Sequence, residues 1–135
     1  MRVFIDTNIL FSAILYRRVT VYAAYCKAVS IPNIGVICEK NVEELIRAFN
    51  RKIPHKIDVL NRFLAAELMS LEIAPMPNDA VDTERKIRDV KDRIIWRSAV
   101  EANVDVFLTG DKDFLESGLK RPPILSPIEY LAFPD

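Results

Sequence analysis

The chain opens with a short apolar run that stops abruptly at polar residues. Residues 3–5 are valine, phenylalanine and isoleucine, and Asp6, Thr7 and Asn8 follow them directly. Such a run is typical of a buried strand in a parallel sheet that helices cover on both faces. A sheet interior does not accept unpaired polar groups, so we expect Asp6 to lie where this strand leaves the sheet.

A second apolar run near the other end of the chain repeats this design. Residues 104–108 are mostly apolar, and Thr109, Gly110, Asp111, Lys112 and Asp113 follow them. Each run therefore ends in a threonine beside aspartates. Ligands of open α/β sheets bind at the carboxyl ends of the strands. We therefore expect the carboxylates of both runs to meet at one edge of the sheet.

Apolar positions of helical period alternate with short apolar runs over the rest of the chain. The pattern predicts strands at residues 34–38, 71–74 and 123–125, and helices over about 7–16, 20–30, 56–69 and 92–102. Thr7 or Asn8 is expected to cap the first helix, and Asn41 a helix that contains Leu45 and Phe49. A short helix should follow Asp113, and Ser126 should begin a final helical turn. This alternation predicts an α/β fold with a mostly parallel sheet, in one domain over residues 1–135.

Composition narrows the classes of protein that fit this pattern. Half of the 135 residues are hydrophobic, which disfavours disorder, and 19 basic residues balance 19 acidic ones. A net charge of zero gives no global attraction to nucleic acid, so any basic surface must be local. Cys26 and Cys38 have no metal-ligand spacing and are interpreted as small buried hydrophobes in a reducing compartment. No apolar stretch approaches the ~20 residues of a membrane span, and no signal peptide is visible, so we expect a cytoplasmic protein without a membrane partner.

Carboxylates are the candidate chemical groups, and six stand near predicted strand ends or helix starts. They are Asp6, Glu44, Asp89, Asp92, Asp111 and Asp113. Three or four carboxylates can hold Mg²⁺ or Mn²⁺, which activates water against a phosphodiester. Each also has a structural explanation. Asp6 or Asp89 can cap a helix, Glu44 suits a helix N-terminus, and Asp111 and Asp113 suit a turn beside Gly110.

Other catalytic arrangements find little support in the sequence. His55 is the only histidine, and it stands beside a proline in a predicted surface loop. The three glycines are far apart, so no glycine-rich phosphate loop is present. Nucleophilic mechanisms that pair serine or cysteine with histidine are therefore disfavoured.

Taken in order, these motifs resemble the PIN domain, the nuclease fold of many toxin–antitoxin ribonucleases. The matching segments are residues 3–10, 43–45, 89–92 and 108–113, and residues 124–131 are similar to the ending of a toxin-like subgroup. The resemblance implies a three-layer α/β/α sandwich with a central parallel sheet of strand order 3-2-1-4-5. It also implies an endoribonuclease that depends on Mg²⁺ or Mn²⁺, forms a homodimer and is restrained by an antitoxin protein.

The resemblance also implies a role for individual residues. By position, the catalytic and metal-binding residues are Asp6, Glu44, Asp92 and Asp111. Supporting residues are Thr7, Asn8, Thr109, Asp113 and Asp89, the last interpreted mainly as a cap. The residues that could hold an RNA backbone, or simply form a solvated surface, are Arg17, Arg18, Arg47, Arg51 and Lys52. Trp96 and Arg97 depart from the family pattern, because small or apolar residues are more usual there.

Two other functions compete with RNA hydrolysis. An aspartyl-phosphate phosphatase typically has a second aspartate two residues after the nucleophile, and here that position is Asn8. A catalytically inactive PIN-fold module that binds RNA or protein would not need all four core carboxylates, which are present. The apolar faces of segments 20–30 and 56–69 exceed what a small sheet needs, and they predict a homodimer or an antitoxin complex.

Overall fold

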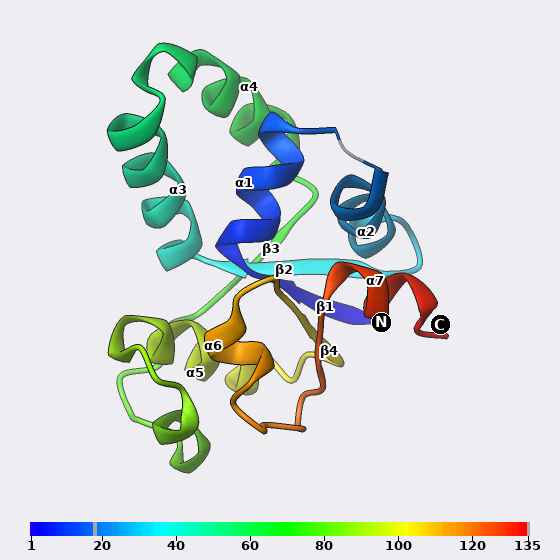
Figure 1. Cartoon of the computed structure of the whole chain (residues 1–135), viewed down its shortest axis with the longest axis vertical. Helices are drawn as coiled ribbons and strands as arrows, with labels where there is room; N and C mark the ends of the chain where they lie inside the picture. Colours follow the sequence, from blue (N-terminus) through cyan, green and yellow to red (C-terminus); the bar gives the residue numbers. More distant parts are fainter. Residues whose placement is uncertain (18, 135) are drawn as a thin grey trace.

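A computed structural model gives the arrangement of residues 1–17 and 19–134 (Figure 1). Five parallel strands form one sheet in the order β3-β2-β1-β4-β5. The strands are β1 (Arg2–Ile5), β2 (Ile34–Cys38), β3 (Glu72–Ala74), β4 (Val106–Leu108) and β5 (Ile124–Leu125). This confirms the predicted order and places β1 at the centre, with β4 directly beside it.

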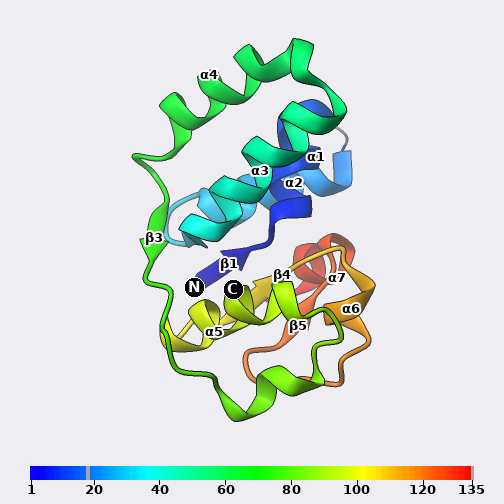
Figure 2. The same ribbon diagram turned by 90° about the vertical axis from the view of Figure 1, so that its left-hand side faces the viewer.

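Helices cover both faces of the sheet, which confirms the three-layer arrangement (Figures 1 and 2). One face carries α1 (Thr7–Leu15), α2 (Val19–Val29), α3 (Glu39–Lys52) and α4 (Ile57–Glu67), with α7 (Pro127–Ala132) packed beside α2. The other face carries α5 (Arg93–Glu101) and α6 (Lys112–Leu115). Single 3-10 turns lie at η1 (Pro54–Lys56), η2 (Asp82–Lys86) and η3 (Val90–Asp92). Within the described residues, none of the helices has the length and apolarity that crossing a membrane requires.

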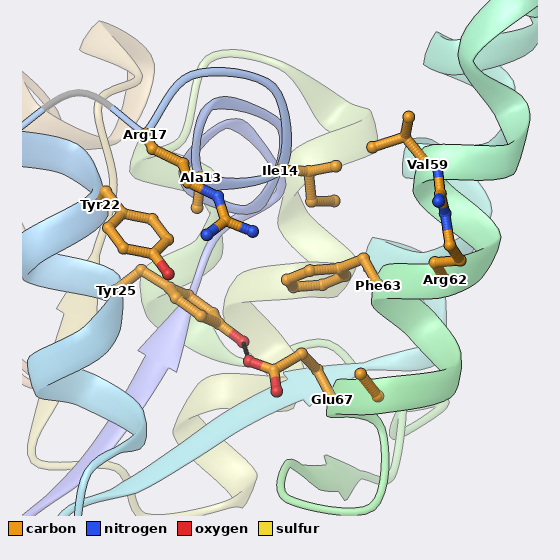
Figure 3. Close-up of a pocket in the computed structure, with 10 residues that line it drawn as sticks. Ala13, Ile14, Arg17, Tyr22, Tyr25, Val59, Arg62, Phe63 and Glu67 are labelled. Atoms are coloured by element: carbon orange, nitrogen blue, oxygen red, sulfur yellow. Dashed lines mark hydrogen bonds between the residues drawn. The ribbon is translucent and has the colours of Figure 1, made fainter.

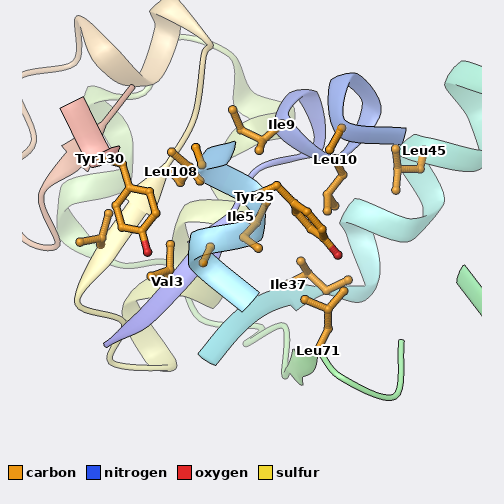
Figure 4. Packing of buried hydrophobic residues seen from close by; sticks show 14 of the residues in the cluster. Val3, Ile5, Ile9, Leu10, Tyr25, Ile37, Leu45, Leu71, Leu108 and Tyr130 are labelled. Atoms are coloured by element: carbon orange, nitrogen blue, oxygen red, sulfur yellow. The ribbon is translucent and has the colours of Figure 1, made fainter. Parts of the chain in front are cut away.

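Each face of the sheet has its own apolar core. On the α1–α4 side, the buried cluster includes Val3 and Ile5 of β1 together with Leu10, Tyr25 and Leu45 from the helices (Figure 4). At Gly35 the packing leaves no room for a side chain, since a Cβ atom there would lie 2.9 Å from both Leu71 Cδ2 and Val29 Cγ1. Glycine therefore allows α2 to pack directly on β2.

The opposite core is aromatic. Phe4 of β1 and Phe107 of β4 stack with ring centroids 5.3 Å apart, and Phe114 and Trp96 pack against Phe107 at 4.6 and 5.4 Å. Aromatic pairs at these separations add to the stability that burial itself provides. The Phe4–Phe107 pair also fixes β1 against β4, the two strands whose ends carry the predicted carboxylates.

Two helix starts differ from the sequence-based expectation. Asp6, not Thr7 or Asn8, caps α1, since its carboxylate accepts the backbone N–H of Thr7. The prediction that Asn41 is a cap is wrong, because α3 already begins at Glu39. The side-chain oxygen of Asn41 instead reaches back to accept the N–H of Cys38 at 2.8 Å. Ser126 caps α7 as predicted.

The long polar segment between β3 and α5 is fastened to α5 by the two residues that depart from the family pattern. Arg97 forms an ion pair with Glu84 at 2.9 Å and donates to the carbonyl of Pro77. Trp96 is fully buried, and its indole N–H donates to the hydroxyl of Thr83. Bulky residues at these positions therefore hold in place the segment that leads to Asp92.

Candidate active site

A cavity of about 540 Å³ opens at the carboxyl ends of β1 and β4. Its wall includes all four carboxylates predicted as catalytic, Asp6, Glu44, Asp92 and Asp111. The other residues that line it are Thr7, Asn8, Phe11, Ser12, Arg47, Ala48, Arg51, Lys52 and Lys91. Four segments that are far apart in the sequence thus bring acidic groups to one place.

Asp6 is the most buried of these carboxylates, with 4% of its surface exposed. Its Oδ1 atom accepts the backbone N–H of Thr7 at 2.8 Å. Its Oδ2 atom accepts the Thr109 hydroxyl at 2.7 Å and the Asn8 amide at 3.2 Å. The carboxylate is therefore held in one orientation by donors from α1 and from Thr109, the residue that follows β4.

Thr109 connects the ends of β1 and β4. Besides donating to Asp6, its hydroxyl oxygen accepts the Asn8 amide at 3.3 Å and the backbone N–H of Asp111 at 3.0 Å. Asn8 in turn accepts the backbone N–H of Gly110 at 3.0 Å. Thr109 and Asn8 thus make the contacts expected of residues that orient carboxylates.

Glu44 reaches the cavity from α3 and contacts α1. The hydroxyl of Thr7 donates to Glu44 Oε1 at 2.6 Å. The same hydroxyl oxygen accepts the side-chain amide of Asn41 at 2.9 Å. Thr7 therefore also has the geometry of a supporting residue, and Glu44 keeps a second carboxylate oxygen for other contacts.

Asp92 also belongs to a second group of carboxylates. One oxygen each from Asp89, Asp92 and Asp113 lie within 4.8 Å of one another. Asp89 accepts the backbone N–H of Lys91 and caps η3, as expected of it, while Asp113 pairs with Arg88 at 3.4 Å. Asp111 lies outside this triad and caps α6 by accepting the N–H of Asp113.

Burial, together with the acidic surroundings, raises the pKa values of two aspartates. Burial raises the pKa of Asp6 to about 7, with Glu44 and Asp111 adding to the rise and hydrogen bonds from Thr109 and Thr7 opposing it. Burial also raises the pKa of Asp92 to about 7, and the negative charges of Asp6 and Asp111 raise it further. Like charges that share a site disfavour the ionised form, so the cavity favours a cation.

The predicted RNA-contacting residues are divided between two places. Arg47, Arg51 and Lys52, on the last turns of α3, line the acidic cavity. Arg17 instead lines a separate groove of about 490 Å³ between α1, α2 and α4, beside Tyr22 (Figure 3). Arg18 lies outside the described residues.

Several residues near the site were not found from the sequence, among them Lys91, Phe11 and Asn41. Lys91 and Phe11 line the cavity, and buried Asn41 supports it from behind through Thr7. Helical spacing offered a signal for two of them. Phe11 lies one turn after Thr7, and Asn41 lies one turn before Glu44, so each shares a helix face with a predicted residue.

Comparisons with known proteins agree with this architecture. A family model described as a PIN domain matches residues 2–113. The chain is similar in structure to VapBC2 from Rickettsia felis, which was crystallised bound to a DNA fragment from the promoter. That match has a TM-score of 0.68 and 18% sequence identity, and it covers 93% of this chain and 98% of the other. No sequence among curated proteins matches the chain.

Proposed function

This chain belongs to the PIN domain family, and from that premise we propose that it is a Mg²⁺- or Mn²⁺-dependent endoribonuclease. The observation that carries the proposal is the wall of four carboxylates from Asp6, Glu44, Asp92 and Asp111 in one cavity. Over the described ranges, 1–17 and 19–134, no lysine or arginine forms an ion pair with any of the four. The carboxylates therefore remain available to a bound divalent cation, although Arg47, Arg51, Lys52 and Lys91 line the same cavity.

The donor set fits a hard divalent cation, since every candidate ligand is a carboxylate oxygen. Asp6, Glu44, Asp92 and Asp111 would hold the ion, with Asp89 and Asp113 close beside Asp92. When bound, such an ion polarises a phosphoryl oxygen and makes water more acidic. The chain orients the ligands before the reaction, because Thr109 and Thr7 donate to Asp6 and Glu44.

The cavity wall also supports RNA as the substrate. Arg47, Arg51, Lys52 and Lys91 surround the carboxylates, and phosphate contacts from such residues position a nucleic acid without reading its sequence. The overall charge of the chain is zero, so attraction to RNA has to come from this local group of cations.

Cleavage of a labelled single-stranded RNA tests the proposal. We expect the wild type to cleave this RNA in Mn²⁺ or Mg²⁺, and we expect cleavage to stop when excess chelator is added. Loss of a residue that supports a metal ligand usually costs about 10–100-fold, so loss of a ligand itself should cost more than about 100-fold in Asp6→Asn and Asp92→Asn. Circular dichroism should find both variants folded, and full activity in either would remove that residue from the site.

A binding measurement with the same RNA separates substrate contact from chemistry. Arg47→Ala combined with Arg51→Ala should weaken binding and reduce its salt dependence. Arg17→Ala is the matched control, because Arg17 lines the other groove. RNA binding by the wild type without any metal-dependent cleavage would favour the inactive binding module instead.

We further propose that the groove between α1, α2 and α4 is a protein interface, as an antitoxin partner or a homodimer would require. Its lining is aromatic and includes Tyr22, Tyr25 and Phe63 (Figure 3). The hydroxyl of Tyr25 donates a hydrogen bond to Glu67 at 2.6 Å. The likeness to VapBC2 supports an antitoxin as the partner.

Light scattering on the chain purified alone tests the homodimer. A dimer is expected at tens of micromolar, and a monomer at that concentration would contradict it.

A further inference from the structure

Two threonine hydroxyls at the site each receive a hydrogen bond from an asparagine and pass one on to a carboxylate. Asn8 donates to Thr109, which donates to Asp6, beside the end of β1. On the other side of the cavity, Asn41 donates to Thr7, which donates to Glu44. The second chain of hydrogen bonds starts from a residue that does not line the cavity.

The orientation of the Asn41 amide is fixed by the backbone. Asn41 is 0% exposed, and its Oδ1 atom accepts the N–H of Cys38 at 2.8 Å. The opposite side of the amide must then present its NH₂ group, which has hydrogens and no acceptor site. That group points at the Thr7 oxygen, 2.9 Å away.

The amide in turn decides where the Thr7 proton goes. A hydroxyl has one proton and is free to rotate, so alone it can donate in several directions. With the Asn41 NH₂ group donating to its oxygen, Thr7 cannot donate toward Asn41. Its proton is directed to Glu44 Oε1 at 2.6 Å, and a hydrogen bond to an ionised acceptor is the stronger kind.

We propose that Asn41 is a positioning residue, which orients the Thr7 hydroxyl toward Glu44 and thereby holds the Glu44 carboxylate ready for a divalent cation. The inference rests on the proposed function, because Glu44 must be a metal ligand for its orientation to matter. Asn41 acts through two other residues and contacts neither the ion nor the RNA. It belongs to α3, the helix that also carries Glu44.

Mn²⁺ affinity measured by titration calorimetry is the readout, and Asn41→Asp is the main variant. Aspartate keeps the acceptor for Cys38 but replaces the NH₂ group with an oxygen, which would draw the Thr7 proton away from Glu44. We expect Mn²⁺ binding to weaken about tenfold or more. The added negative charge alone would tighten cation binding, so a loss has the opposite sign to a simple charge effect.

Asn33→Asp is the matched control for burial. Asn33 is the other buried asparagine of the described residues, and it lies away from the cavity. Its side chain accepts a hydrogen bond from the N-terminal amino group and donates one to the carbonyl of Lys27. This variant should lose stability without losing Mn²⁺ affinity. If Asn41→Asp does not fold, Asn41→Ala leaves the Thr7 hydroxyl free to rotate and should also weaken Mn²⁺ binding.

A double-mutant cycle with Thr7 tests the route of the effect. In Thr7→Val no hydroxyl remains to orient, so adding Asn41→Asp should cause no further loss of Mn²⁺ affinity. Thr7→Ser restores the hydroxyl and should bind Mn²⁺ like the wild type. Unchanged affinity in the Asn41 variants, or additive losses in the cycle, would overturn the role of Asn41.

The outcomes separate this inference from the proposed function. Suppose that the wild type binds Mn²⁺ but cleaves no RNA, and that Asn41→Asp binds Mn²⁺ more weakly. This result would support the positioning role and contradict the nuclease. A wild type that binds Mn²⁺ and cleaves RNA, with variants of equal affinity, would contradict only the positioning role. A wild type that does not bind Mn²⁺ would overturn both.

Discussion

Asp92→Asn should melt higher than the wild type when both are measured in chelator at pH 8. Burial and neighbouring carboxylates raise the pKa of Asp92 to about 7, against about 4 in an unfolded chain. The folded state therefore holds a proton that the unfolded state releases between about pH 4 and 7. Stability falls as pH rises through that window, and at pH 8 the full cost is present.

The size of this effect follows from the shift and the exposure of the group. Because solvent screens the charge of the half-buried Asp92, we expect the raised pKa to cost the folded wild type on the order of 2 kcal/mol at pH 8. For a chain of this length that is a rise of about 7 °C in melting temperature. At pH 4 the difference should nearly vanish, because the Asp92 carboxyl is then protonated in the folded wild type.

Mn²⁺ should reverse the order of the two melting temperatures, so that the wild type melts higher than Asp92→Asn. Mn²⁺ stabilises the form that binds it better, and Asp92→Asn has lost one proposed ligand. Asp58→Asn is a suitable control, since Asp58 lies in the first turn of α4, where the helix dipole favours its charge. That control should melt slightly lower, in chelator and in metal alike. A lower melting temperature of Asp92→Asn in chelator would mean that its carboxylate stabilises the start of α5.

Trp96→Ala should destabilise the protein by about 3–5 kcal/mol, the range for removing a large buried aromatic side chain. Trp96 is 0% exposed and packs on Phe107, and its indole N–H donates a hydrogen bond to the hydroxyl of Thr83. Its loss leaves a cavity between α5 and the sheet and releases η2 from α5. Chemical denaturation measures the loss of stability. Hydrogen exchange in Trp96→Ala should be fastest in residues 77–92.

Trp96→Phe separates packing from hydrogen bonding in this prediction. Phenylalanine keeps a ring against Phe107 but cannot donate to Thr83, so its cost should be less than half that of alanine. If Trp96→Ala costs under about 1 kcal/mol, the segment between β3 and α5 is held by the Arg97–Glu84 pair instead.

The sheet could be predicted from the sequence because buried strands of a parallel sheet are apolar throughout. Strand β2 matches its predicted limits, residues 34–38, since the turn at Pro32 and the polar start of α3 bound the run. Both apolar runs end in a threonine beside aspartates, and this repeated pattern predicted that Asp6 and Asp111 lie close together. Both line the same cavity.

Residues whose position depends on distance along a helix were harder to place. Arg17 follows α1, which runs away from the strand ends for nine residues, or roughly 13 Å of helix. Its place in the other groove follows from that length. The sequence named Asp89, Asp92 and Asp113 as candidates but did not predict that they form a group, because the segment between β3 and α5 has no periodic pattern and is positioned by tertiary contacts.

The strand order has a consequence for a chain that is made from its N-terminus. Strands β3, β2 and β1 lie on one side of the sheet, so this half can pair before β4 is synthesised. At that stage β1 is an open edge, and the chain carries Asp6 and Glu44 without Asp111. Only when β4 pairs with β1 are all four carboxylates brought together. The topology therefore delays the complete site until most of the chain has left the ribosome.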